Sequence, residues 1–576
     1  MSKAIYVCSR NHFFNDVTKS RLTDICNELT PDNIPSMKPR VMITEHVSYG
    51  VWNPSSTLSE EGSSLALGTF FGDSSRWHLP LHEYPDGSFA IFRDGTKYCE
   101  IVTDPAASRT IWYYLDDELF IASSSQRAIC MYLGSFELDD SVIPWILSTG
   151  SLGPTHSWDR RLKRIPPDSS ILLDKEQWTI STRSSPIRFV QLSESDDDHE
   201  ELLRSSLYSV IGSLGLNFSD WALPLSGGYD SRGILCLMIN GLSDSEVKKL
   251  QTITWGLESD IEVKGSDAYV AGELSKTLGV SNKYFHNDWS EETVDVILDR
   301  FLLQGEGRID HFSTYLDGFA IWKTLFQDGI QGVIRGDECF GYKSVRSATD
   351  TRLVVGCGLC SDYSNLKNYQ KYGIPEQILP KSLHQEDGES LALWRDRLYQ
   401  QYRLPVILSA LTDLKSSYVE IINPLLSRQV LRQVRRLPDH LRSDKALFGK
   451  IVDSLSPNVG FAVASGGASR EVLLREKKMI DVLVSELSSK SAEEVFSYEF
   501  LSFVLSDIKE ERKKPNGVAG IGYSIMSKIE ALVLLFLKKA ARQKVDGNVL
   551  AFRVYMMIKM YKILKIDSAK YGEENM

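Results

Sequence analysis

A short loop with the sequence Ser226-Gly-Gly-Tyr-Asp-Ser231 constrains the fold of this chain more than any other feature. An apolar run at 221–225 precedes it, and residues 234–239 after it have the composition of a helix. A strand that enters a turn of small residues and leaves it as a helix is the unit from which parallel α/β sheets are built. Backbone N–H groups at the start of such a helix favour an anion. The loop therefore predicts an anion-binding turn at the edge of a parallel sheet.

The residue types of the loop indicate that the anion is a phosphate held together with a cation. Gly227 and Gly228 allow the backbone to approach a ligand, because they carry no Cβ atom. Ser226 and Ser231 add hydroxyl donors, whereas Asp230 carries the wrong charge for direct contact with phosphate. A magnesium ion between Asp230 and the phosphates resolves this conflict. The loop lacks the pattern of a Walker loop; the alternative is a structural glycine turn before a helix.

The order of the other elements predicts two kinds of sheet. Up to about residue 190, short apolar runs such as 88–92 and 119–122 alternate with turn signals, which is typical of a sandwich of antiparallel sheets. An acidic run at 193–201 marks a linker or a helix start. Beyond it, strands expected at 250–255 and 283–286 and a helix at 267–278 predict a doubly wound parallel sheet, and residues after about 385 are typical of helices. We therefore expect an α/β protein with domains at 1–192 and 200–480 and a helical extension at 481–576.

The composition bears on partners and location. The net charge of −11 argues against a nucleic-acid partner. The first residues are too weakly apolar for a signal peptide and no run has the length of a membrane span, so we expect a cytoplasmic protein. The residues after 500 hold 14 Lys and Arg against 8 Asp and Glu. Their amphipathic stretch at 529–542 either packs on the protein or docks on a membrane or partner. Cys357 and Cys360 are half of a zinc or redox site or, as we expect, ordinary reduced thiols.

The loop resembles the pyrophosphate loop of the ATP-pyrophosphatase family, Ser-Gly-Gly-x-Asp-Ser, whose members split ATP between the α and β phosphates. A second loop, Ile334-Arg-Gly-Asp-Glu-Cys-Phe-Gly-Tyr342, resembles the second phosphate-side loop of the asparagine synthetases. The resemblance implies that Asp337 shares a magnesium–pyrophosphate complex with Asp230, and that Leu225 and Gly336 lie against the nucleotide. A later segment, Tyr418-Val-Glu-Ile-Ile-Asn-Pro-Leu-Leu-Ser-Arg428, resembles the stretch that precedes the family's active-site lysine, which Lys445 matches. That lysine would neutralise charge as pyrophosphate leaves.

The N-terminal part resembles the glutaminase-type domain of the same family. Tyr84-Pro-Asp-Gly-Ser-Phe-Ala90 is among the matching segments, and the likeness runs in order over about residues 80–460. A working glutaminase of this class needs a cysteine directly after the initiator methionine, where this chain has Ser2. We therefore expect a degenerate Ntn-hydrolase-like domain without glutamine hydrolysis. β-Lactam synthetase and the lasso-peptide cyclases share this defect and close an internal amide. Glu420 matches a glutamate that assists a tyrosine as base in the β-lactam formers, but Ile334 stands at the tyrosine's position and cannot move protons.

Together these features predict an ATP-dependent, AMP- and pyrophosphate-forming amide ligase that adenylates the carboxylate of a small molecule or peptide for attack by an amine. Its cofactors would be ATP and Mg²⁺, with Lys445 and Glu420 as catalytic residues. The alternatives are an asparagine synthetase that uses ammonia and a non-catalytic nucleotide-binding scaffold. A homodimer or a pathway partner stays open.

Several residues near the motifs keep two interpretations. Gly256, after the strand expected at 250–255, is either a turn glycine or a nucleotide contact. Three arginines either reach phosphate or a substrate carboxylate or lie on the surface: Arg232, Arg335 and Arg346. His286 and His311 have no metal-ligand spacing, and we expect them to be structural.

Overall fold

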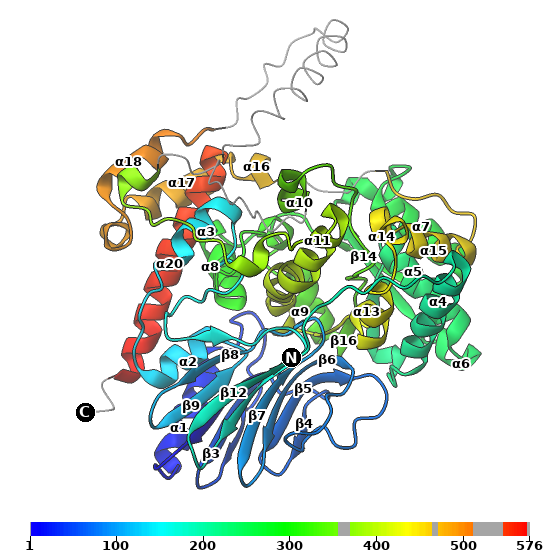
Figure 1. Cartoon of the computed structure of the whole chain (residues 1–576). Helices are drawn as coiled ribbons and strands as arrows, with labels where there is room; N and C mark the ends of the chain where they lie inside the picture. The colour runs from blue at the N-terminus through cyan, green and yellow to red at the C-terminus, as the bar shows by residue number, and fades with distance from the viewer. Residues whose placement is uncertain (1, 355–368, 464–469, 511–544, 573–576) are drawn as a thin grey trace, which may run out of the picture.

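The N-terminal part of the chain folds into two antiparallel sheets of six strands each (Figure 1). The computed structural model describes residues 2–354, 369–463, 470–510 and 545–572. The first sheet has the order β10 (Lys163–Arg164), β8 (Trp112–Leu115), β9 (Leu119–Ser123), β1 (Lys3–Ser9), β3 (Val47–Trp52), β2 (Arg40–Ile43). The second has the order β12 (Thr179–Ser184), β11 (Ser169–Asp174), β7 (Tyr98–Thr103), β6 (Gly87–Asp94), β5 (Ser64–Phe70), β4 (Ser59–Glu61).

Alternation along the strands explains how these two sheets pack. Along β1, Tyr6 and Cys8 belong to the core between the sheets. Ile5 and Val7 point to the other side, where helices α1 (Asp16–Glu28) and α2 (Gln126–Leu133) cover the first sheet. The expected antiparallel sandwich is confirmed, and the strands expected at 88–92 and 119–122 are β6 and β9.

A five-stranded parallel sheet follows, with the order β15 (Ser281–His286), β14 (Gln251–Gly256), β13 (Trp221–Pro224), β16 (Gly332–Ile334), β17 (Glu420–Ile422). Ala222 and Val333 face one core, which includes α8 (Val294–Gly305), α9 (Ala320–Gln327) and α12 (Ser409–Ser416). Leu223 and Ile334 face the other, which includes α4 (Asp196–Gly212), α5 (Tyr229–Gly241) and α15 (Ala446–Leu455). The doubly wound sheet is therefore confirmed. The chain leaves the central strand β13 toward β14 on one side and reaches β16 on the other, so β13 marks the switch point of the topology.

The last helix, α20 (Gly547–Gly572), drawn in red in Figure 1, returns to the N-terminal part of the molecule. It packs against α2, where Arg127 donates a hydrogen bond to Asp567 at 2.7 Å. Farther up the helix, Arg553 donates to the buried Asp310 at 2.8 Å. The helix thus shares a hydrophobic core with helices that cover the N-terminal sheets. The division of the chain at 192, 200 and 480 stays a prediction.

The helical character expected after about residue 385 is confirmed, with one short exception in the described residues. Residues 420–422 form β17 at the edge of the parallel sheet. A three-residue strand is too short to show a pattern, and its pairing with β16 decides its conformation. The acidic run at 193–201 leads into α4, whose first turn Ser195 caps. Cys357, Cys360 and the stretch 529–542 lie outside the described residues.

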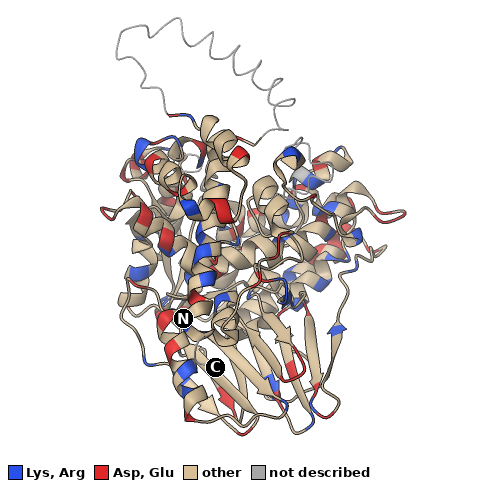
Figure 2. Cartoon of the chain, turned by 90° about the vertical axis from the view of Figure 1, so that its left-hand side faces the viewer, with Lys and Arg blue, Asp and Glu red and all other residues tan. Residues whose placement is uncertain are grey.

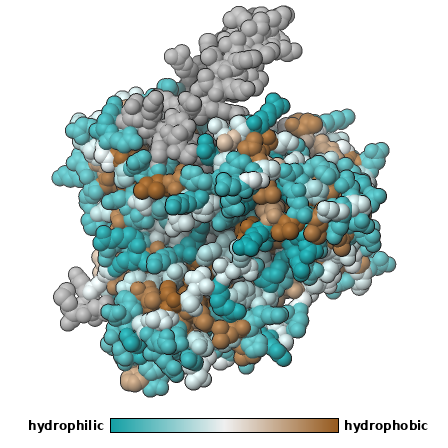
Figure 3. Space-filling view, in the orientation of Figure 1, coloured by the Kyte–Doolittle hydropathy of each residue, from teal (hydrophilic) through white to brown (hydrophobic). Residues whose placement is uncertain are grey.

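The surface mixes charges of both signs. Figure 2 shows Lys and Arg interspersed with Asp and Glu over the helical part of the molecule, so the net charge is not gathered on one face in this view. Figure 3 shows hydrophobic residues in separate groups between hydrophilic ones. Among the helices that the structure describes, none is both long and apolar enough to cross a membrane.

Candidate active site

A cavity of about 300 Å³ opens at the carboxyl edge of the parallel sheet, beside β13. Ligands of open α/β sheets bind at this edge, at the switch point of the topology. The walls come from the ends of β13, β14 and β16 and from the first residue of α7 (Asp267–Leu278). The lining residues are Pro224, Leu225, Ser226, Asp230, Ser231, Thr254, Trp255, Asp267, Arg335, Gly336 and Asp337.

The loop between β13 and α5 is held by its own serines. The Ser226 N–H donates to Ser231 Oγ at 3.0 Å, and the Gly228 N–H donates to Ser226 Oγ at 3.3 Å. The two hydroxyl oxygens lie 3.0 Å apart. These bonds fix the turn so that Asp230, in the first turn of α5, stands in the cavity wall beside both hydroxyls.

Gly227 is required by a neighbouring segment of the protein. A Cβ on Gly227 would lie 2.4 Å from Ala462 Cβ, and its N–H donates to Asp267 at 3.0 Å. Neither Gly227 nor Gly228 lines the cavity in this conformation. The absence of a side chain at Gly227 therefore makes room for residues 457–463, which cover the loop.

The segments that follow β13 and β16 are in close contact. A Cβ atom added to Gly336 would lie 3.0 Å from the backbone nitrogen of Ser231. Asp230 and Asp337 thereby face the same cavity. Burial raises the pKa of Asp230; Lys445 opposes this shift and the charge of Asp337 adds to it. The described residues contain no cluster of three or more metal-binding side chains, but Mg²⁺ commonly takes one or two carboxylates together with phosphate oxygens. The two aspartates fit such an ion.

Each of these carboxylates is paired with a cation of the chain. Lys445 Nζ donates to both oxygens of Asp230 at 2.8 Å. Arg335 donates to both oxygens of Asp337 at 3.1 and 3.2 Å. Burial disfavours the charge on Asp337, but the nearby cations, Arg335 first among them and Lys415 as well, together hold the pKa of this carboxyl below its ordinary value. A metal ion at this site therefore competes with Lys445 and Arg335.

A strained turn at the start of α15 presents Lys445. Asp444 and Lys445 have left-handed φ values of 57° and 58°, which costs about 1–3 kcal/mol for each residue. The Asp444 carboxylate accepts hydrogen bonds from the hydroxyl and N–H of Ser344, and the Asp444 N–H donates to the Tyr342 carbonyl at 3.0 Å. Contact between residues 341–344 and this turn thus compensates the strain and directs the ammonium to Asp230.

Glu338 also belongs to the site, although it was not selected from the sequence. Its carboxylate lies 3.1 Å from Lys445 Nζ, and its side chain is only 6% exposed. Burial raises the pKa of Glu338 to about 7, with Lys445 opposing the shift and Asp230 reinforcing it. Lys445 is therefore shared between two carboxylates. The signal that could have found Glu338 is its position directly after Asp337 and before the buried Cys339 and Phe340.

Four further residues of the cavity wall were not selected from the sequence. Pro224 ends β13, Thr254 and Trp255 lie near the end of β14, and Asp267 begins α7. Gly256, which was selected, does not line the cavity, and a Cβ on it would lie 2.6 Å from the Tyr284 hydroxyl. This packing favours its interpretation as a turn glycine.

Arg232 neither reaches the cavity nor lies on the surface, which corrects both interpretations of its sequence position. It is fully buried, and it donates to the carbonyl groups of Val459 at 2.8 Å and Gly460 at 2.6 Å. Its guanidinium carbon lies 3.9 Å from the centre of the Phe461 ring. On α5 the side chain points away from the phosphate loop and holds residues 457–463 in place.

Glu420 lies apart from the cavity. It begins β17 at the amino edge of the sheet, whereas the cavity opens at the carboxyl edge. The side chain is fully buried and forms an ion pair with Arg109 of the N-terminal part. It also accepts a hydrogen bond from the Thr57 hydroxyl at 2.8 Å. Glu420 thus connects the parallel sheet to the N-terminal sandwich, and Ile334 is buried at the end of β16.

The remaining candidates fall into two groups. Arg335 lines the cavity, in agreement with its phosphate or substrate interpretation. The residues that are exposed and do not line it are Arg346, His286 and His311.

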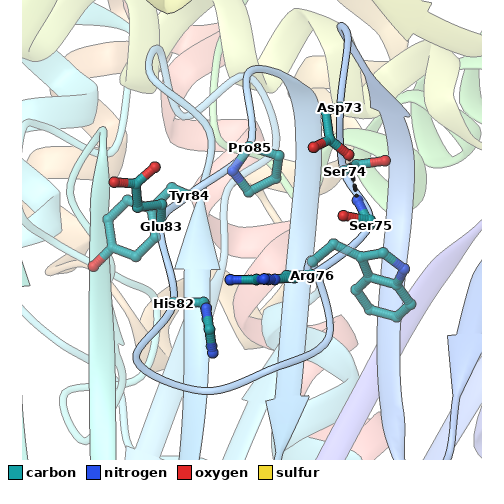
Figure 4. Close-up of a pocket in the computed structure, with 9 residues that line it drawn as sticks. Asp73, Ser74, Ser75, Arg76, His82, Glu83, Tyr84 and Pro85 are labelled. Carbon is teal, nitrogen blue, oxygen red and sulfur yellow. Dashed lines mark hydrogen bonds between the residues drawn. The ribbon is translucent and has the colours of Figure 1, made fainter.

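A second cavity, of about 340 Å³, lies in the N-terminal part between β5 and β6 (Figure 4). Figure 4 shows the Arg76 side chain extending across the opening, with His82 and Glu83 on the opposite side. The loop that connects β5 to β6 is held by the buried Arg93, which donates to the carbonyl groups of Trp77 and His82 at 2.6 and 3.0 Å. None of the predicted catalytic, nucleotide-binding or metal-binding residues lines this cavity, although Tyr84 and Pro85 of the segment that resembles the glutaminase-type domain do.

No family model matches this sequence, and no curated protein matches it either. Solved structures that are similar to it include two enzymes. The U34-tRNA thiolase of Methanococcus maripaludis, solved with its 4Fe–4S cluster, has 14% sequence identity and a TM-score of 0.23, over 56% of this chain and 84% of the thiolase. The glutamine phosphoribosylpyrophosphate amidotransferase of B. subtilis, complexed with ADP and GMP, has 10% identity and a TM-score of 0.20, over 59% of this chain and 83% of the amidotransferase. Likeness at these scores does not bear on function, which has to be argued from the site.

Proposed function

We propose that the protein is an ATP-dependent, AMP- and pyrophosphate-forming amide ligase that activates a carboxylate as an acyl-adenylate. The observation that carries the proposal is the meeting of Asp230, Asp337 and Lys445 at the carboxyl edge of the sheet. Carboxylates beside a phosphate-type loop suit a magnesium–polyphosphate complex, and a lysine at the same point suits a departing pyrophosphate.

Different residues of the site have different roles in the first step, adenylation. Asp230 and Asp337 would hold Mg²⁺, which neutralises charge on the pyrophosphate. With Asp230 engaged in this way, Lys445 would be free of its two bonds to that carboxylate and would donate to phosphate oxygens instead. The hydroxyl groups of Ser226 and Ser231 donate to the same group. A carboxylate oxygen then forms a bond to the α-phosphorus, and the bond from the α-phosphorus to the bridging oxygen breaks. Pyrophosphate leaves with the electron pair.

In the second step an amine attacks the acyl carbon and loses a proton, and AMP leaves. We propose that the amine belongs to a substrate and does not come from glutamine hydrolysis in this chain. The Ser2 hydroxyl is buried, accepts a hydrogen bond from the Ser55 N–H at 2.8 Å and donates to the Asn53 carbonyl at 3.4 Å. Glu420 is engaged by Arg109, so we assign it a positioning role between the two parts of the molecule.

Exchange of radiolabelled pyrophosphate into ATP tests the proposal. A panel of carboxylic acids, including aspartate and peptides with free carboxyl groups, supplies the acyl substrate. We expect exchange with one class of acid, loss of exchange in Asp230→Ala, and wild-type exchange in Lys450→Met. Lys450 is the matched control because it lies on α15 with an exposed side chain.

The outcomes separate the alternatives. Nucleotide binding without exchange for any acid would identify a binding scaffold, and absence of nucleotide binding would refute the proposal. Formation of asparagine from aspartate, ATP and ammonium would establish the ammonia-dependent asparagine synthetase instead.

A further inference from the structure

A buried lysine beside the candidate active site forms no ion pair with any carboxylate in the described part of the chain. Lys415 lies in the last turn of α12 and is 5% exposed. Its ammonium lies 5.6 Å from the centre of the Trp322 ring. A buried charge without a partner is strongly destabilising. Such a residue requires an explanation in terms of function or of a ligand.

Lys415 belongs to the surroundings of the cavity. The Trp322 ring packs edge-on against Trp255 at a centroid distance of 5.7 Å, and Trp255 lines the cavity. Burial lowers the pKa of Lys415 well below the ordinary lysine value; the charge of Arg335 adds to this shift and Asp337 opposes it. Both of these charged residues line the cavity. The charge of Asp337 therefore acts on both cations, although only Arg335 donates hydrogen bonds to it.

The two cations lie on one side of the sheet and Lys445 on the other. Side chains alternate along β16: Val333 faces the core with α12, and Ile334 faces the core with α5 and α15. The ladder continues to Arg335, whose N–H donates to the Ile422 carbonyl at 2.8 Å. Arg335 therefore emerges on the same side as Lys415, opposite the helix that carries Lys445.

Adenylation requires an in-line arrangement, in which the attacking and leaving oxygens lie on opposite sides of the α-phosphorus. The pyrophosphate loop and Lys445 form the leaving side, so the acyl substrate has to arrive from the other side. We propose that Lys415 and Arg335 bind the carboxylate of the acyl substrate on that side of the cavity. This inference rests on the proposed function and adds the two residues that recognise the acid.

The charges at the site imply an order in which nucleotide and acid bind. Arg335 is occupied by Asp337 in the structure. Once magnesium takes Asp337, both cations are left without a carboxylate, and an anion that docks there supplies the missing counter-charge. After adenylation the acyl group is neutral, so the same cations no longer hold it. Mg·ATP therefore binds first, and the acid binds to the complex.

The experiment uses the full chain, Mg²⁺ with α,β-methylene-ATP, and acetate as the smallest carboxylate probe. Thermal unfolding is followed at constant ionic strength, with chloride replaced stepwise by acetate, and labelling of Lys415 by a lysine-specific reagent is followed by mass spectrometry. The variants are Lys415→Met, Arg335→Met and, as control, Lys283→Met. Lys283 lies on β15 of the same sheet with a side chain that is 55% exposed. Lys415→Met removes a buried unpaired charge, so its ligand-free Tm should equal or exceed that of the wild type.

We expect acetate to raise the Tm of the nucleotide complex and to slow the labelling of Lys415, in the wild type and in Lys283→Met. Both Lys415→Met and Arg335→Met should lose the acetate effect, with an apparent Kd for acetate raised by ~10-fold or more. All variants should keep the increase in Tm caused by the nucleotide. In Arg335→Met this increase should be larger, since Asp337 is free for the metal.

Two results would overturn the inference. An acetate effect that is absent from the wild type, or unchanged in Lys415→Met, would exclude a carboxylate site. A loss of the nucleotide effect in Lys415→Met would instead assign Lys415 to phosphate. If the wild type shows no nucleotide effect at all, it is the proposed function that fails, which keeps the two failures distinct.

Discussion

Replacement of Lys445 by methionine should have opposite effects on metal binding and on adenylation. In the ligand-free protein Lys445 occupies both oxygens of Asp230 at 2.8 Å and lies 3.1 Å from Glu338. A hydrogen bond to a charged group contributes about 1.5–3 kcal/mol. The side chains of Lys445 and Asp230 are 26% and 33% exposed, so solvent screening favours the lower end. Lys445→Met should therefore bind Mg²⁺ ~10-fold more tightly in the absence of nucleotide.

Adenylation should change in the other direction. Lys445 is the cation that would receive the charge of the departing pyrophosphate, and removal of one such donor from an active site typically lowers kcat by ~10²–10³-fold. Titration calorimetry with Mg²⁺ measures the first effect, and pyrophosphate exchange measures the second. Lys450→Met controls for the loss of a charge from α15, because Lys450 is exposed and pairs with Glu200 at 2.8 Å. Weaker Mg²⁺ binding in Lys445→Met, or an exchange rate equal to that of the wild type, would refute this reasoning.

Three further predictions follow from single contacts. Gly227→Ala should destabilise the fold by about 1–3 kcal/mol in urea unfolding, since its Cβ would lie 2.4 Å from Ala462 Cβ; Gly449→Ala, with no atom closer than 3.9 Å, should not. Arg232→Met should cost about 3 kcal/mol, from two lost hydrogen bonds to a charged donor, and unchanged hydrogen exchange at 457–463 would contradict this. Glu338→Gln should gain stability relative to the wild type as the pH rises from about 4.5 to about 7, because a folded-state pKa above the ordinary value makes ionisation unfavourable for folding. The gain is at most about 3 kcal/mol, and a difference that is constant with pH would exclude it.

The sequence was most informative where local residues determine local structure. The loop at 226–231 needs only an apolar strand before it and a helix after it, and both are present as β13 and α5. Short apolar runs between turn signals likewise made the sandwich predictable, and the succession of strands and helices made the parallel sheet predictable. Asp230 and Asp337 of the candidate site were predictable because each lies in a loop, or the first turn after it, that directly follows a strand of the parallel sheet.

Residues whose surroundings come from distant segments were not predictable in the same way. Arg232 follows the loop directly, but its partners are carbonyl groups at 459 and 460. Lys415 looks like an ordinary helical lysine until the packing of α9 and β16 around it is known. Glu420 matched a motif, yet its role depends on Arg109, which lies in the N-terminal part. In each case a long-range contact determines which way the side chain points, and no local pattern carries that information.

The N-terminal sandwich is part of the structural support of the parallel sheet. Arg428, which follows β17 and opens helix α13 (Arg428–Val434), donates to the Tyr84 carbonyl at 2.7 Å and to Asp168 at 2.6 Å. Elsewhere in the interface between the sandwich and the parallel sheet, Glu420 forms a fully buried ion pair with Arg109. Loss of one partner of such a pair leaves an uncompensated buried charge, which typically costs 3–5 kcal/mol, so β17 depends on the sandwich for its counter-charges. Because β17 pairs with β16, and β16 ends at the loop that carries Asp337, the position of a candidate metal ligand depends in turn on that interface. The sandwich therefore has a physical reason to be retained whether or not it hydrolyses glutamine.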